Sequence, residues 1–97
     1  MTSNDPRNSL PSYPRVYLTI ARRNANVSGE ALAFELGITK GYYYALENGA
    51  RGHKITVIML ARITELLGAD PTQMIKDEVR YQEERDVYIR SKTKKKT

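Results

Sequence analysis

The side chains that most often carry covalent or metal chemistry are scarce in this sequence. It contains no cysteine, which excludes a thiolate nucleophile, a disulfide and a cysteine-based zinc site. Its single histidine, His53, lies in a basic loop with no nucleophile motif nearby and no second metal ligand in view. The carboxylates Glu83 and Glu84 fall on a stretch with the pattern of a solvated helix. The sequence therefore predicts no enzyme, no metal and no cofactor.

The chemistry that the composition does favour is contact with an anion. The chain has 97 residues, and its 16 Lys and Arg against 11 Asp and Glu leave a formal net charge of +5. An excess of positive charge attracts phosphate-rich partners. Beyond Asp86 every charged residue is positive, which predicts a disordered basic tail that adds nonspecific affinity for nucleic acid.

The period of the apolar residues and the signals at segment ends predict five helices and no strand, which is an all-α fold. The predicted helices cover about Arg15–Asn24, Gly29–Leu36, Lys40–Asn48, Val57–Leu67 and Pro71–Arg90. Hydroxyl or carboxylate residues that can cap a helix precede four of them: Ser28, Thr39, Thr56 and Asp70. Glycines able to end a helix follow three of them: Gly37, Gly49 and Gly68.

Three regions follow from this pattern. Residues 1–14 carry three prolines and few apolar side chains, so they are predicted to form a flexible N-terminal arm. Residues 15–75 form the helical domain. Residues 76–97 form a helical extension and the basic tail, and the charges of both signs between Lys76 and Asp86 indicate a largely solvated helix.

The segment Ser28–Gly49 carries a motif in spacing as well as in residue type. A small residue, a turn glycine, an aliphatic residue and a closing aliphatic-glutamate pair stand at Ala33, Gly37, Ile38, Leu46 and Glu47. The segment resembles the helix-turn-helix of the Cro and phage-repressor family, the xenobiotic-response-element type, and the resemblance extends from about Val16 to Ile75. It implies a compact five-helix lambda-repressor-like domain that binds double-stranded DNA and regulates transcription, in a phage or another mobile element.

The resemblance also implies roles for individual residues. The expected recognition helix turns Tyr43 into the core and faces DNA bases with Lys40, Gly41, Tyr42 and Ala45, with Tyr44 at the flank. The residues expected to contact phosphates are Ser28, Gly29, Asn48, Arg51, His53 and Lys54. Gly29 stands where the family often has a glutamine, so only its backbone N–H can make that contact. An ion pair between Arg22 and Glu47 is expected to tie the first helix to the third.

The partners are less closely defined by the sequence. A pseudo-palindromic site would suit a homodimer, and the candidate contact residues in the C-terminal extension are Val79, Tyr81, Val87, Tyr88 and Ile89. The same residues carry an alternative, in which the protein is an antitoxin or a modulator that binds a protein partner. A third reading is nonspecific nucleic-acid or RNA binding through the tail. The longest apolar runs are far shorter than a membrane span, which predicts no membrane contact and a cytoplasmic protein.

Overall fold

The computed structural model describes residues 12–51 and 54–93, and these residues form an all-helical domain without strands. Five helices follow one another along the chain: α1 (Val16–Asn24), α2 (Gly29–Leu36), α3 (Lys40–Asn48), α4 (Val57–Leu67) and α5 (Pro71–Thr93). The predicted fold class is confirmed. The last helix continues to Thr93, three residues beyond the predicted end at Arg90, so part of the expected basic tail is helical.

The helices begin and end where the sequence signals stand. Four predicted N-caps accept a hydrogen bond at 3.0 Å from the backbone N–H three residues later: Ser28 from Ala31, Thr39 from Tyr42, Thr56 from Met59 and Asp70 from Gln73. Gly37, Gly49 and Gly68 all have positive φ just after a helix. These local interactions satisfy backbone groups that the helix itself leaves unpaired, which is why the boundaries could be predicted.

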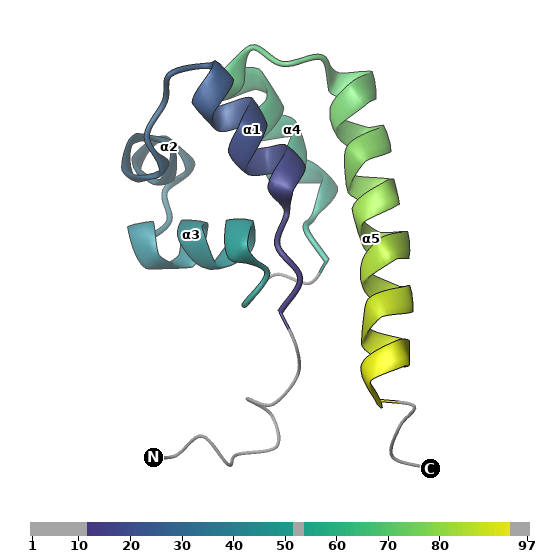
Figure 1. The fold of residues 1–97 in the computed structure, drawn as a ribbon. Coiled ribbons are helices and arrows are strands. Elements are labelled where there is room, and N and C mark those ends of the chain that lie inside the picture. Colours follow the sequence, from purple (N-terminus) through teal and green to yellow (C-terminus); the bar gives the residue numbers. More distant parts are fainter. Residues whose placement is uncertain (1–11, 52–53, 94–97) are drawn as a thin grey trace, which may run out of the picture.

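The core lies between α1, α2, α3, α4 and the first part of α5. Figure 1 shows α1 crossing near α4, with α2 and α3 to one side of them and the long α5 along the other side. The buried apolar side chains come from all five helices: Leu18, Leu32, Ala33, Leu36, Tyr43, Leu46, Leu60, Ile63, Leu67 and Met74. Burial of these side chains supplies the main driving force for folding.

The N-terminal half of α5 is part of the domain, although most of its residues are exposed, as its charges indicated. Met74, Glu78 and Tyr81 are buried, and their spacing of four and three residues places them on one face of the helix. That face packs against the bundle, where Glu78 is paired with Arg15. The many charges of α5 therefore conceal one stripe of buried residues.

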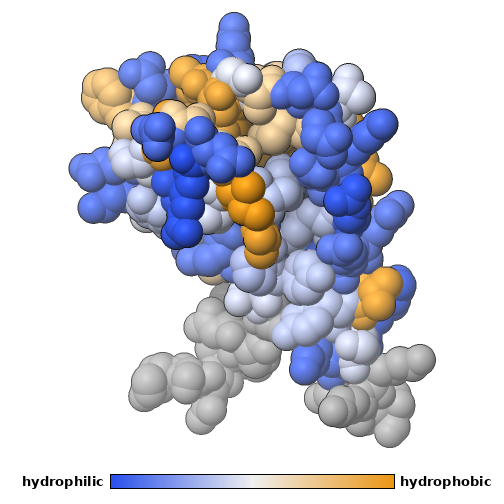
Figure 2. Space-filling view, turned by 45° about the horizontal axis from the view of Figure 1, so that its top comes forward, coloured by the Kyte–Doolittle hydropathy of each residue, from blue (hydrophilic) through white to orange (hydrophobic). Residues whose placement is uncertain are grey.

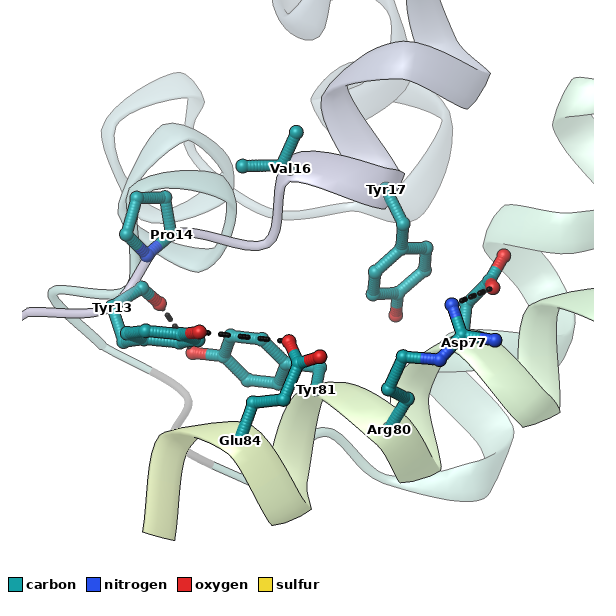
Figure 3. A pocket seen from close by; sticks show the side chains of 8 residues that line it. All are labelled: Tyr13, Pro14, Val16, Tyr17, Asp77, Arg80, Tyr81 and Glu84. Atoms are coloured by element: carbon teal, nitrogen blue, oxygen red, sulfur yellow. Dashed lines mark hydrogen bonds and ion pairs between the residues drawn. The ribbon is translucent and has the colours of Figure 1, made fainter. Parts of the chain in front are cut away.

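Tyr13 belongs to the packed structure, which corrects the boundary of the predicted arm at residue 14. Its backbone carbonyl accepts a 2.6 Å hydrogen bond from the hydroxyl of Tyr81, and its own hydroxyl lies 3.5 Å from Glu84 (Figure 3). The ring centroids of Tyr13 and Tyr88 are 5.0 Å apart. An aromatic residue next to Pro14 thus anchors the chain to α5. Residues 1–11 lie outside the described part of the chain.

The surface combines hydrophilic residues with exposed apolar side chains, and Figure 2 shows both kinds on one face. The most exposed apolar residues are Phe34 on α2 and Val57 and Ile58 at the start of α4. Within residues 12–51 and 54–93, none of the helices is long and apolar enough to cross a membrane.

Candidate nucleic-acid interface

The helices α2 and α3 are joined by a three-residue turn that fixes their crossing. Gly37 adopts φ +74°, a conformation that a residue with a Cβ disfavours. The N–H of Ile38 donates to the carbonyl of Ala33 at 3.1 Å, which closes the end of α2. Ala33 is buried and has the small side chain that close helix approach requires. The turn therefore sets α3 against α2 as a helix-turn-helix unit.

The rear face of α3 is part of the core. Tyr43 is 0 % exposed and Leu46 is also buried, as the sequence predicted for Tyr43. The two residues are three positions apart and lie on the same side of the helix. Because this side is packed against the bundle, the opposite side of α3 must face outward.

The outward face of α3 carries the residues that were expected to face bases. Lys40 and Gly41 are exposed, and the residues Tyr42 and Tyr44 are 38 % and 37 % exposed. Ala45 is half-buried, so it is less exposed than these four residues. In Figure 1 neither α5 nor any other helix covers the side of α3 turned away from α1. The start of α3 is thus a short exposed rod with one amine and two aromatic rings.

The expected ion pair between Arg22 and Glu47 is present and forms the centre of a buried polar network. Nε of Arg22 lies 2.5 Å from a carboxylate oxygen of Glu47, and both side chains are almost fully buried. The carboxylate also accepts hydrogen bonds from the hydroxyls of Tyr43 at 2.6 Å and Thr19 at 2.9 Å. This network fastens the end of α3 to α1.

The network changes the ionisation of its members. Burial by itself raises the pKa of Glu47, but the hydrogen bonds from Arg22, Tyr43 and Thr19 outweigh it, and the pKa is lowered from its ordinary value. Burial and the nearby Glu47 carboxylate both raise the pKa of the Tyr43 hydroxyl. Glu47 is therefore ionised and Tyr43 is protonated at neutral pH.

A second buried ion pair, which was not predicted from the sequence, fastens the same end of α3 to α5. Nε and Nη2 of Arg15 lie 3.0 and 3.1 Å from the two oxygens of Glu78, and Nη1 donates to the carbonyl of Leu46 at 2.9 Å. The hydroxyl of Tyr17 donates to Glu78 at 2.6 Å. The Arg15 guanidinium also lies 4.5 Å from the centre of the Tyr81 ring. One signal that could have indicated this face of α5 is the seven-residue spacing of Met74, Tyr81 and Tyr88.

The residues expected to contact phosphates lie in two places, at the start of α2 and at or after the end of α3. Arg51 and Lys54 are exposed after α3, while Asn48 is exposed and its side-chain oxygen accepts a hydrogen bond from the N–H of Ala50. The exposed Ser28 caps α2. Gly29, by contrast, is buried under the ring of Tyr44. His53 lies outside the described residues. Phosphate contact by this set stays a prediction.

The surface expected to bind a protein partner is only partly available. Val79 and Val87 are exposed, but Tyr81 is buried and the ring of Tyr88 packs at a tilt against Tyr13. The extension predicted to contact another protein therefore uses two of its aromatic residues to hold the chain's own N-terminal segment.

Comparison with known proteins agrees with this geometry. The sequence model of a family described as a helix-turn-helix domain matches residues 15–74. The chain belongs to this helix-turn-helix family. Searches of curated proteins and of solved structures found no match. The matched residues of this helix-turn-helix protein run from the buried Arg15 to Met74 in α5, so they include the helix pair and its supports.

The helix-turn-helix domain shows no constellation for metal binding in its described part. No group of three or more His, Asp or Glu side chains is placed to hold an ion within residues 12–51 and 54–93. What the arrangement offers is a recognition surface: a braced helix whose outer face carries donors and aromatic rings. Such a surface is typical of proteins that bind DNA.

Proposed function

We propose that this protein is a sequence-specific transcriptional regulator of the Cro and phage-repressor type, which represses by occupying its operator in the cytoplasm. The observation that carries the proposal is the two-sided character of α3. Tyr43 and Leu46 hold one side in the core, while Lys40 and Tyr42 project from the other. A helix held in this way can enter the major groove with its first residues against the base edges.

Base reading would depend on few polar groups. Lys40 can donate to O6 or N7 of guanine or to a phosphate. Tyr42 can contact a thymine methyl group with its ring or a phosphate with its hydroxyl. Gly41 and Ala45 bring no hydrogen-bonding side chain to the groove, so apolar contact and the shape of the DNA would contribute the remaining specificity.

Phosphate contacts on either side of α3 would set its register in the groove. Arg51 and Lys54 follow α3 and are exposed, and both are positively charged. Ser28 and Asn48 are exposed near α2 and α3 and can donate further hydrogen bonds. Each neutralised phosphate releases counterions, so the affinity for DNA should fall as the salt concentration rises.

We further propose that the regulator binds as a homodimer. Two recognition helices must enter successive major grooves about 34 Å apart on a two-fold symmetric site. A groove between α4 and α5 supports this proposal because its lining includes Ile55, Val57, Ile75 and Val79, with Val57 81 % exposed. Covering the exposed apolar side chains of such a groove with a second protein surface removes them from water, which is favourable.

The test is selection of bound sequences from a random pool of DNA duplexes with the purified protein at low ionic strength. The proposal predicts enrichment of one motif with two-fold symmetry, whose half-site spacing matches a dimer. Enrichment of a motif without symmetry would contradict the homodimer. Failure to enrich any motif, with no retention of duplexes at low salt, would contradict DNA binding itself.

A further inference from the structure

The first turn of α2 and the outer face of α3 meet where Gly29 and Tyr44 touch. Gly29 is the first residue of α2 and is buried although it stands at the edge of the domain. A methyl group at position 29 would lie 2.4 Å from Cζ of Tyr44 and 2.6 Å from its hydroxyl oxygen. Such distances are far shorter than van der Waals contact, so any side chain at this position must displace the tyrosine ring.

Two other side chains contact the ring of Tyr44 as well. Tyr43 meets it edge-on, with ring centroids 5.8 Å apart and planes at 69°. The guanidinium of Arg22 lies 5.7 Å from its centroid. Arg22 is itself held by Glu47, so one support of the ring belongs to the buried network. Tyr44 nevertheless remains 37 % exposed, so part of its ring is accessible to DNA.

We propose that Gly29 is a positioning residue, and that Tyr44, seated in the space it leaves, supplies the DNA contact at the start of α2. This inference rests on the proposed function. Gly29 has no side chain to offer to DNA, and the hydroxyl of Tyr44 lies over the first turn of α2 in its place. The two positions therefore act as one unit of the interface.

The test is a cycle of four proteins: the unchanged chain, G29A, Y44A and the double variant. Each protein is assayed for its melting temperature and for affinity to the duplex most enriched in the selection. Because Tyr44 is partly exposed, its ring can swing outward, so G29A folds but loses the seated ring. Alanine also favours a helix more than glycine does. G29A should therefore raise the melting temperature in the Y44A background. The change that it causes there should exceed the change that it causes in the otherwise unchanged chain by roughly 4 °C or more.

The affinity for DNA separates a positioning role from packing alone. Y44A should lower the affinity about tenfold, the loss expected for one charge-assisted hydrogen bond to phosphate. G29A should lower it almost as much, and the double variant should bind no more weakly than Y44A. Equal effects of G29A in both backgrounds, on either quantity, would overturn the proposal, and so would unchanged affinity in G29A.

The matched control is G41A, because a methyl group at Gly41 meets no atom within 4 Å. G41A should raise the melting temperature by the same amount in the unchanged chain and in the Y44A variant. Should no duplex be enriched, the proposed function fails, while the coupling in melting temperature between positions 29 and 44 can still be measured. The two failures are therefore distinguishable.

Discussion

Arg15 lies 3.0 Å from Glu78 and 2.9 Å from the carbonyl of Leu46, so one buried side chain joins α5 to the end of α3. The backbone N–H of Arg15 adds a 2.7 Å hydrogen bond to the carbonyl of Glu47. Glu47 is in turn paired with Arg22 of α1. Two buried ion pairs thus hold the end of α3 from two sides. The start of α3 is exposed, where it can contact DNA.

Removing Arg15 should be strongly destabilising. Arg15→Met leaves Glu78 buried without its cationic partner, which costs about 3–5 kcal/mol in the free energy of unfolding. The double variant R15M/E78M should cost clearly less than the sum of its single changes, because it leaves no unpaired charge. Urea denaturation measures all three. The control is R80M, since Arg80 is 63 % exposed and lies 3.7 Å from Asp77, and its loss should cost about 1 kcal/mol or less. Strictly additive costs at positions 15 and 78 would contradict this account.

Gly49 should tolerate a side chain less well than Gly37. Both have positive φ, +80° and +74°, so alanine at either position costs about 1 kcal/mol in backbone strain. A methyl group at Gly49 would also lie 2.2 Å from the backbone oxygen of Tyr13, while at Gly37 it meets nothing within 4 Å. G49A should therefore lower the melting temperature well beyond G37A. Equal melting temperatures would mean that Tyr13 is not held against the end of α3.

Glu47 should make the protein sensitive to acid. Its pKa is lowered in the folded state, so the unfolded chain takes up the proton first as the pH falls. The stabilisation is complete above the ordinary pKa of glutamate, near 4.3, and is lost as the pH falls through the lower folded value. Unfolding free energies from pH 6 to pH 3 should fall more steeply for the unchanged protein than for E47Q. Parallel curves would show that Glu47 does not carry this linkage.

The parts of the fold that could be predicted from the sequence are those with local causes. Ser28 and Thr39 cap helices through atoms three residues away, and Gly37 ends α2 by its own backbone preference. The Arg22–Glu47 pair followed from the family resemblance.

The parts that could not be predicted depend on contacts distant in sequence. Arg15 and Glu78 are 63 residues apart, and the residues next to each of them in the sequence do not indicate that the two form a pair. The seat of Tyr44 on Gly29 depends on the crossing of α2 and α3, although the missing side chain at Gly29 was itself a signal. Tyr13 was assigned to the arm because its flanking prolines outweighed a single aromatic residue.

Base reading by α3 can be tested by a fluorescence anisotropy titration of the selected duplex and of a random duplex with K40A/Y42A. We expect the affinity to fall roughly tenfold or more on the selected duplex and much less on the random one, because base contacts discriminate between sequences while phosphate contacts do not. K76A, which removes the same charge from α5, should bind like the unchanged protein. Unchanged affinity of K40A/Y42A for the selected duplex, or equal losses on both duplexes, would contradict base reading by α3.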